Sequence, residues 1–311
     1  MKQGLKNIFN TLYNRLILFN NPYYFYGIPN VDYVKRGDSV ELKKIGLTVH
    51  QKEGDSLIKG YFYAIKIKQA LNGKFTLVNG GVFLAIGPLQ FRINSAEELF
   101  IVYEVFICED YKYCCLRDTV FVDIGMNAGI TTLYYAQQPL VKQIYSFELF
   151  RPTFMLGEQN LKLNETFSGK VKAFNYGLSN RSYTTTLDYS LTRKGRMGLK
   201  GLPADEQFSD AVNETVIVKD IAEVFETLIA ASGSSDIIVK MDCEGEEYNL
   251  IERLSNSGLL GKLTVLIVEW HYIRPTAIEN QLKAADFHVF SQTLPTLDSG
   301  IIYAGKRNLP L

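Results

Sequence analysis

The residues between 120 and 129 carry the clearest chemical signal in the chain. Their sequence, Val-Phe-Val-Asp-Ile-Gly-Met-Asn-Ala-Gly, is typical of a buried strand that ends near Asp123 and turns into a helix at Gly129. Glycines let a ligand approach the backbone closely, and the start of a helix offers free N–H donors. Glu148 follows Gly129 by nineteen residues, at the end of the next apolar run. An acidic side chain there can accept hydrogen bonds from both ribose hydroxyl groups of an adenosine cofactor.

Two classes of cofactor share this arrangement, and the residues of the turn distinguish them. Dinucleotide enzymes use the pattern G-x-G-x-x-G because a pyrophosphate must lie against the start of the helix. Here Met126 and Asn127 interrupt that glycine spacing, and Asp123 would repel a pyrophosphate. An acidic residue suits the amino group of S-adenosylmethionine, which is therefore the predicted cofactor. The predicted cofactor-binding residues are Asp123, Gly125, Asn127, Gly129 and Glu148. A nicotinamide cofactor, or a turn that binds no ligand, is the alternative.

Two later apolar runs end in residues that could act as acids or bases. Lys240-Met-Asp242 closes one run, Glu244 follows it, and Glu269-Trp-His271 closes the next. Because neighbouring parallel strands end at the same edge of a sheet, we expect these side chains to converge beside the cofactor. An alcohol becomes a good nucleophile when a base takes its proton. His271, with an ordinary pKa of about 6.5, is one candidate base. Asp242 is the other, acting directly or by orienting the imidazole ring.

The predicted catalytic residues are Asp242, His271 and Glu244. The same set, together with Glu269, also offers oxygen ligands of the kind that Mg²⁺ prefers. Because the spacing of these residues is not distinctive of a metal site, no metal ligand is assigned and a divalent metal is the less favoured alternative. Glu246 and Glu247 open a predicted helix, where the helix dipole favours acidic residues. They are expected to cap that helix or to face solvent.

From residue 118 onward, short apolar runs alternate with helical stretches, as in an α/β fold whose sheet is covered on both faces. The predicted strands are 119–124, 143–147, 170–174, 237–241, 263–269, 288–292 and 301–304. The last two lie about eight residues apart, too close for a helical crossover, so they should pair antiparallel. We therefore expect a mostly parallel seven-stranded sheet with an antiparallel final hairpin. Residues 181–214 show no clear element and are expected to form an inserted loop or lid that supplies acceptor contacts.

Residues 1–109 are expected to form an α+β extension that binds the acceptor or mediates dimerisation, and residues 110–311 the catalytic domain. Within the extension, Asn79-Gly80-Gly81 predicts a hairpin turn because such turns need residues with positive φ. A helix is expected over 61–71, and Ser95 with Glu98 has the spacing of a capping box. Apolar residues recur at helical spacing in the first twenty positions. They predict a helix packed on its own domain or on a partner, with a membrane-surface helix as the alternative.

Composition narrows the choice of partners. The chain has 311 residues, with 33 basic and 33 acidic side chains and a pI near 6.8. This balance argues against nucleic acid as the main partner, because phosphate binding needs a basic face. The four cysteines form no C-x-x-C pair, which favours a reducing cytoplasmic location. The apolar runs are too short to cross a bilayer. The expected partner is a small-molecule or glycan acceptor, and the sequence allows a homo-oligomer as well as a monomer.

Four motifs together resemble the FkbM-type methyltransferases. They are Asp123-Ile-Gly125-Met-Asn127-Ala-Gly129, Ser146-Phe-Glu148, Asn160-Leu-Lys-Leu-Asn164 and Lys240-Met-Asp242-Cys-Glu244-Gly245-Glu246-Glu247, within a match that covers residues 95–305. The resemblance implies a class I methyltransferase (Rossmann-like) fold, S-adenosylmethionine as the donor, and O-methylation of a hydroxyl group on a sugar, glycan or natural product. The chain departs from the family where Leu149-Phe150-Arg151 precedes Pro152. A non-catalytic module that binds an adenosine ligand and a nicotinamide-dependent oxidoreductase are the alternatives.

Overall fold

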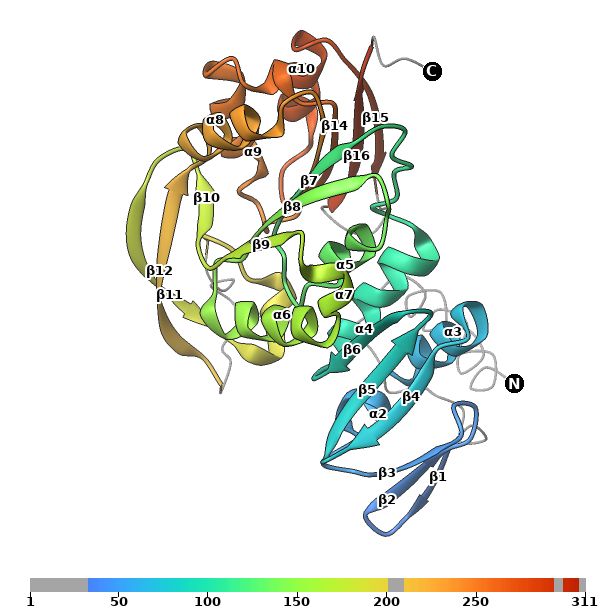
Figure 1. Cartoon of the computed structure of the whole chain (residues 1–311). Coiled ribbons are helices and arrows are strands. Elements are labelled where there is room, and N and C mark those ends of the chain that lie inside the picture. Colours follow the sequence, from blue (N-terminus) through green and yellow to red (C-terminus); the bar gives the residue numbers. More distant parts are fainter. Residues whose placement is uncertain (1–32, 201–209, 294–298, 308–311) are drawn as a thin grey trace, which may run out of the picture. The chain divides into compact units, whose positions relative to one another are not determined.

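The computed structural model describes residues 33–200, 210–293 and 299–307 (Figure 1). The helix predicted for the first twenty residues lies outside these ranges. The chain divides into two compact units, Met1–Tyr103 and Glu104–Leu311, which are described separately below. Within the described ranges, every helix is too short or too polar to span a membrane.

The first unit consists of two small antiparallel sheets with helices beside them. Its strands are β1 (Tyr33–Arg36), β2 (Ser39–Leu42), β3 (Leu47–His50), β4 (Lys74–Val78), β5 (Gly81–Ile86) and β6 (Leu89–Ile93), and its helices are α2 (Asp55–Lys59), α3 (Tyr61–Leu71) and α4 (Ala96–Tyr103). The predicted helix over 61–71 and the predicted hairpin are confirmed, with Asn79 and Gly80 at φ values of 50° and 74°. Glu98 accepts a hydrogen bond from the backbone N–H of Ser95, as a capping box requires.

The second unit is built around the predicted seven-stranded sheet. Its strands are β7 (Thr119–Ile124), β8 (Val141–Phe147), β9 (Val171–Phe174), β13 (Asp236–Met241), β14 (Val265–His271), β15 (Phe287–Thr293) and β16 (Ser299–Lys306). They follow the spatial order β15-β16-β14-β13-β7-β8-β9. All neighbours pair in parallel except β16, which is antiparallel to both β14 and β15. The predicted class I methyltransferase fold with its antiparallel final hairpin is confirmed.

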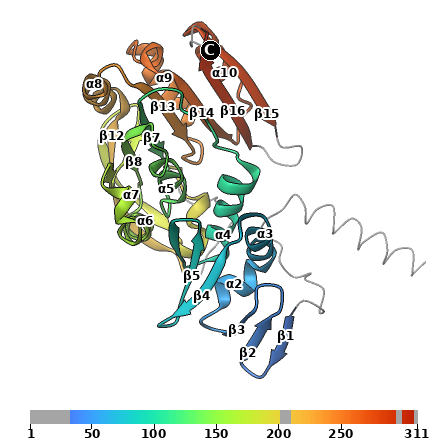
Figure 2. The same cartoon turned by 45° about the vertical axis from the view of Figure 1, so that its right-hand side comes forward.

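Helices cover both faces of this sheet (Figures 1 and 2). They are α5 (Ile130–Ala136), α6 (Arg151–Leu163), α7 (Glu165–Ser168), α8 (Ile221–Ser232), α9 (Glu247–Asn256) and α10 (Thr276–Ala284). Alternate strand residues point to opposite faces. Val122 packs in a core with Phe225 of α8 and Leu250 of α9, while its neighbour Phe121 stacks on Tyr135 of α5. Because both faces of the sheet are covered, all six residues of β7 are buried; four of them are apolar, and the other two, Thr119 and Asp123, are hydrogen-bonded.

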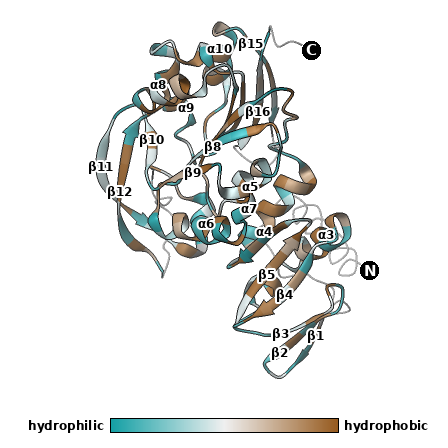
Figure 3. Cartoon of the chain, in the orientation of Figure 1, coloured by the Kyte–Doolittle hydropathy of each residue, from teal (hydrophilic) through white to brown (hydrophobic). Residues whose placement is uncertain are grey.

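The hydropathy colouring shows the same division between interior and surface (Figure 3). The short strand β5 is coloured as hydrophobic, and alternate residues along it are buried. The helix α6 carries more hydrophilic colour, and only three of its residues are buried. Burial of the apolar face of each element, with its other face in solvent, stabilises its packing on the rest of the unit.

The expectation that residues 181–214 hold no regular element is wrong. β11 (Tyr183–Tyr189) and β12 (Val212–Asp220) form a long antiparallel ladder, and β10 (Gly177–Ser179) pairs in parallel with β12. A short 3₁₀ helix, η2, spans Leu191–Arg196. Val216 and Val218 are buried while Ile217 between them is exposed, so β12 has the alternation of a strand with one solvated face. In β11, Leu187 and Tyr189 flank Asp188 and the pattern of residue types has a period of two, which is the signal that could have predicted that strand.

Candidate active site

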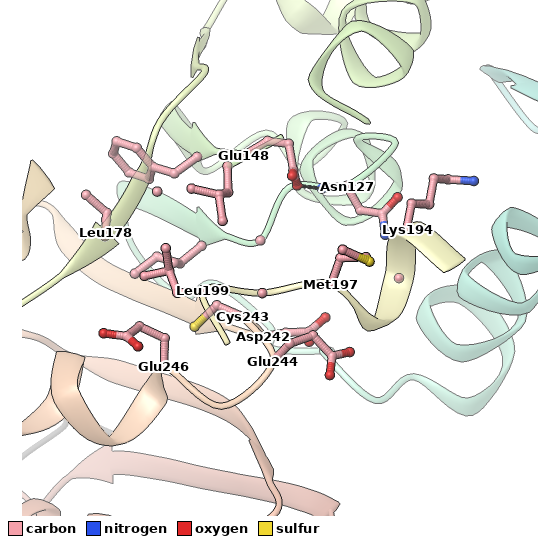
Figure 4. Close-up of a pocket in the computed structure, with 17 residues that line it drawn as sticks. Asn127, Glu148, Leu178, Lys194, Met197, Leu199, Asp242, Cys243, Glu244 and Glu246 are labelled. Atoms are coloured by element: carbon pink, nitrogen blue, oxygen red, sulfur yellow. Dashed lines mark hydrogen bonds between the residues drawn. The ribbon is translucent and has the colours of Figure 1, made fainter. Parts of the chain in front are cut away.

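A pocket opens where β7, β8 and β13 end, at the carboxyl edge of the large sheet (Figure 4). Among the predicted site residues, Gly125, Asn127, Glu148, Asp242 and Glu244 line this pocket. In the close-up, Asn127 and Glu148 lie on the opposite side of the pocket from Asp242 and Glu244. The pocket lies at the edge where ligands of open α/β sheets bind. Three predicted residues lie outside its lining: Asp123, Gly129 and His271.

Residues from the region predicted to be a featureless loop also contribute to the pocket. Lys194 of η2 and the segment from Met197 to Leu199 line it. Gly198 packs so closely on the backbone after β13 that a Cβ atom built on it would lie 2.8 Å from the carbonyl oxygen of Cys243. The sequence analysis expected acceptor contacts from this region but singled out none of these wall residues, because they carry no recognisable motif.

Gly125 is required by the close approach of two chain segments. Its φ is 86°, in the left-handed region, and a Cβ atom there would lie 1.8 Å from the carbonyl oxygen of Asp242. The N–H groups of Gly125 and Met126 both donate to the carbonyl oxygen of Phe147, at 3.0 and 2.9 Å. The turn after β7 is therefore held between the ends of β8 and β13, and no side chain fits at position 125.

Glu148 holds the other side of this turn. One carboxylate oxygen accepts the backbone N–H of Asn127 at 2.9 Å, and the other accepts that of Phe150 at 3.0 Å. The side chain is nearly buried, and burial raises its pKa to about 7 although both hydrogen bonds lower it. Each carboxylate oxygen has a further lone pair, so Glu148 can also accept hydrogen bonds from a ligand in the pocket.

Asp123 lies behind the pocket wall and acts on its neighbours. Its carboxylate is fully buried, accepts a hydrogen bond from Thr132 at 2.6 Å, and lies 3.3 Å from the ammonium of Lys240. Lys240 donates to the carbonyl oxygen of Gly125 at 2.7 Å and also lies 3.3 Å from Asp242. Burial lowers the pKa of Lys240, but Asp242 and Asp123 outweigh that effect and raise it above its ordinary value. Lys240, which the sequence analysis did not single out for a role, thus links the glycine turn to Asp242.

Beside the pocket, Asp242, Glu269 and His271 point at one another. One ligating atom from each residue can be chosen so that all lie within 4.8 Å of one another. The residues come from the adjacent parallel strands β13 and β14, as their positions in the sequence predict. Burial and the charge of Asp242 raise the pKa of Glu269 to about 7. The sheet therefore brings together polar residues at the carboxyl ends of β13 and β14.

Glu247 controls the far side of the imidazole ring. It is fully buried, and one oxygen accepts the N–H of Cys243 at 2.9 Å and lies 3.2 Å from Nδ1 of His271. The solvent-exposed position considered for Glu247 is therefore wrong. Burial lowers the pKa of His271, but the hydrogen bond to Glu247 and the charge of Glu244 raise it well above its usual range. Nε2 faces Glu269 and Glu244 at 3.8 and 3.9 Å.

Glu244 stands between the pocket and the histidine. Its backbone adopts a φ of 55°, uncommon for a residue with a side chain, and its carboxylate accepts a hydrogen bond from Tyr272 at 3.1 Å. Burial raises the pKa of Glu244 to about 8, with His271 opposing the shift and Asp242 adding to it. Carboxylates outnumber cations here, and each additional one disfavours ionisation of the others.

Tyr111 and Glu104 complete the site from the segment before β7. The hydroxyl group of buried Tyr111 donates to Glu269 and lies 3.5 Å from Asp242, while Tyr135 donates to the carbonyl oxygen of Tyr111 at 2.6 Å. Burial and the charge of Glu269 raise the pKa of Glu104 well above its ordinary value. The segment that carries Glu104 and Tyr111 resembles the one that precedes the glycine motif in the FkbM-type methyltransferases, but the sequence analysis assigned neither residue a role in the site.

Comparison with known proteins relates the chain to methyltransferases. It is 27% identical over 217 residues to Methyltransferase sdnD of Sordaria araneosa, which covers 62% of this chain and 82% of that protein. It is 27% identical over 178 residues to Methyltransferase 1 of Beauveria bassiana, which covers 52% of this chain and 71% of that protein. Methyltransferase FkbM from Methylobacillus flagellatus, a solved structure, has 14% identity and a TM-score of 0.41, over 80% of this chain and 60% of that one. The chain matches no protein-family model. The two curated relatives confirm the resemblance to methyltransferases that the motifs predict.

Proposed function

We propose that the protein is an S-adenosylmethionine-dependent methyltransferase that methylates a hydroxyl group of a sugar, glycan or other small natural product. The observation that supports this most is the pairing of carboxylates across one pocket, with Glu148 on one side and Asp242 and Glu244 on the other. The ribose hydroxyl groups of an adenosine cofactor need hydrogen-bond acceptors, and a sulfonium ion is stabilised by negative charge near it. S-adenosylmethionine carries both of these groups.

In this proposal a different group of residues contacts each part of the cofactor. Glu148 accepts hydrogen bonds from the ribose hydroxyl groups. The apolar side chains of Phe147, Leu149 and Leu178, which line the same pocket, cover the adenine ring. The methionine part lies along the turn at Gly125, toward Asp242. Asp123 contributes by holding Lys240 and the turn in place, since its carboxylate does not line the pocket.

The reaction is an in-line displacement at the methyl carbon. The oxygen of the acceptor hydroxyl forms a bond to this carbon, the bond from carbon to sulfur breaks, and neutral S-adenosylhomocysteine leaves with the electron pair on sulfur. The hydroxyl proton moves to a carboxylate. We assign that role to Asp242 because it lines the pocket whereas His271 lies outside the lining. Glu244, also in the lining, and His271 behind it orient the acceptor and balance the charge. Holding both reactants in line supplies much of the rate.

Thermal denaturation of the full chain with different ligands tests the cofactor assignment. We expect S-adenosylhomocysteine to raise the melting temperature, since a ligand that binds only the folded state stabilises it. NAD⁺ should have no effect. Glu148→Gln should weaken the response to S-adenosylhomocysteine by at least tenfold in concentration, whereas Glu165→Gln, at an exposed acidic position in α7, should respond as the wild type does. A response to NAD⁺ alone would indicate an oxidoreductase.

A turnover assay tests the catalytic assignment. Formation of S-adenosylhomocysteine is measured with a panel of sugars, glycans and phenolic natural products. Asp242→Ala should reduce turnover by about 10²–10⁴-fold, the range of a lost general base, while S-adenosylhomocysteine, which lacks the sulfonium charge, still binds. If the wild type and Asp242→Ala both bind the cofactor and have equal turnover rates, Asp242 is not the base. If cofactor binds and no acceptor in any class reacts, the non-catalytic binding module becomes the better account.

A further inference from the structure

We infer that Asp242, Glu269 and His271 bind a divalent metal ion, and that this ion holds the methyl acceptor through two adjacent oxygen atoms. The inference rests on the proposed function and adds to it a cofactor and a substrate class. The acceptor would carry neighbouring hydroxyl groups, or a hydroxyl group beside a carbonyl group, as in a vicinal diol.

The geometry of the three side chains suits one ion. Their ligating atoms lie within 4.8 Å of one another. Two atoms that each bind a metal at about 2.1 Å are separated by at most about 4.2 Å, so small rotations of the side chains bring all three into contact with a single ion. Asp242 follows β13 and His271 ends the adjacent strand β14, so rigid neighbouring strands position the ligands.

The imidazole of His271 is already oriented as a metal ligand. The residue is 8% exposed, and its Nδ1 is engaged by the buried carboxylate of Glu247 at 3.2 Å. Nε2 points into the cluster and makes no hydrogen bond within the described part of the chain; the carboxylates of Glu269 and Glu244 stand 3.8 and 3.9 Å away. Because Glu247 accepts the Nδ1 proton, a metal ion that displaces the proton of Nε2 can bind at that nitrogen.

The other two ligands have outer partners as well. Tyr111 donates its hydroxyl group to Glu269 from a buried position, and the ammonium of Lys240 lies 3.3 Å from Asp242. Residues that contact metal ligands in this way fix their orientation, and their loss typically weakens metal affinity by about 10–100-fold. All three proposed ligands are therefore held by a second residue.

Carboxylates face this cluster from several elements. Glu244 and Glu247 lie 3.9 and 3.2 Å from the imidazole nitrogens of His271, and Lys240 lies 3.3 Å from Asp242. A divalent ion between Asp242 and Glu269 would place positive charge among these carboxylates.

The donor set indicates which ion to use as a probe. Carboxylates suit Mg²⁺ and Mn²⁺, whereas an imidazole ligand suits transition metals. Mn²⁺ satisfies both preferences. Three protein ligands leave further coordination positions open on an ion that takes six. Two adjacent oxygen atoms of an acceptor can fill two of these, and binding to the ion makes their hydroxyl protons easier to remove.

Titration of the metal-free full chain with MnCl₂, followed by electron paramagnetic resonance and calorimetry, tests the site. We expect one Mn²⁺ per chain in the wild type, and at least tenfold weaker binding in Asp242→Asn and His271→Gln. His288→Gln removes an exposed histidine on β15 and should bind as the wild type does. Tyr111→Phe keeps all three ligands and should weaken binding by about tenfold or more, so it serves if a ligand variant fails to fold.

The outcomes separate this inference from the proposed function. Absence of Mn²⁺ binding to the folded wild type, or equal binding by wild type, His271→Gln and Asp242→Asn, overturns the metal site. Binding of S-adenosylhomocysteine is measured on the same metal-free sample. If that ligand binds and Mn²⁺ does not, the proposed function stands without the metal. If Mn²⁺ binds at these residues and the nucleoside does not, the metal site stands and the proposed function fails.

Discussion

Gly125 offers the most exacting test of how the site is assembled. In Gly125→Ala the new Cβ atom would lie 1.8 Å from the backbone carbonyl oxygen of Asp242. That oxygen belongs to the chain segment that follows β13, so the clash cannot be relieved by rotating a side chain. Gly129→Ala is a matched control. Gly129 has a similar φ, 77° against 86°, but its nearest neighbour would be the Cα atom of Gly157 at 3.5 Å, an ordinary contact.

These distances set the expected loss of stability. A left-handed backbone costs a residue with a Cβ atom about 1–2 kcal/mol, and that cost applies to both variants. Forcing an atom into packed backbone adds about 1–3 kcal/mol, for Gly125→Ala alone. The free energy of unfolding should therefore fall by about 2–5 kcal/mol in Gly125→Ala and by about 1–2 kcal/mol in Gly129→Ala.

Urea denaturation followed by fluorescence measures the difference directly. Trp270 is the single tryptophan of the chain and is buried in the core of the second unit, so its emission reports the unfolding of that unit. With a slope near 2–3 kcal/mol per molar urea for a unit of this size, the midpoint for Gly125→Ala should fall by about 1–2 M. Equal midpoints for the two variants would falsify the claim that backbone contact between the glycine turn and Asp242 requires this glycine.

Three further predictions concern the charged residues Glu148, Lys240 and Asp220. Burial raises the pKa of Glu148 to about 7, and ribose hydroxyl groups bind its ionised form, so affinity for S-adenosylhomocysteine should rise about tenfold from pH 6 to pH 8. Calorimetry in two buffers should detect proton release on binding near neutral pH. An affinity that does not change with pH would contradict the role of Glu148. Lys240→Met leaves Asp123 and Asp242 without their cation and should lower the free energy of unfolding, measured by urea denaturation, by about 3–5 kcal/mol. The double variant Lys240→Met/Asp123→Asn should regain part of this stability. If it regains none, Lys240 and Asp123 do not interact. Asp220 caps α8 through the N–H of Ala222 at 2.8 Å and pairs with Arg253, so Asp220→Ala should cost about 1–3 kcal/mol and Asp220→Asn less. Although partial burial opposes it, Arg253 lowers the pKa of Asp220, so this contribution is present near neutral pH and is lost as the pH falls through the lowered value; unchanged stability of Asp220→Ala at pH 7 would count against the cap.

The sequence by itself determined the sheet and the residues that end its central strands. β7 begins and ends where its apolar residues predict, because a strand buried on both faces is mostly apolar; its one charged residue, Asp123, is paired with Lys240. Asp242 and His271 meet because they close adjacent parallel strands, a consequence of topology that spacing alone predicts. These are local patterns combined with a simple rule about strand ends.

The alternating strands β11 and β12 were missed for a different reason. The exposed face of β11 carries threonine and aspartate, and that of β12 mixes polar residues with Val212 and Ile217, so neither segment has the long buried apolar run of a central strand. The pocket wall at Met197 depends on how this segment folds back on the end of β13. Nothing in the local sequence specifies that approach.

Tertiary structure alone decided which charged groups share one environment. Tyr111 meets Glu269 across 158 residues, and Lys240 meets Asp123 across the parallel pairing of β13 and β7. Glu247 looked like a surface residue of a first helical turn, yet it is buried against His271. The strength of such interactions depends on distance and on burial away from water, and neither quantity is encoded in the spacing of residues along a chain.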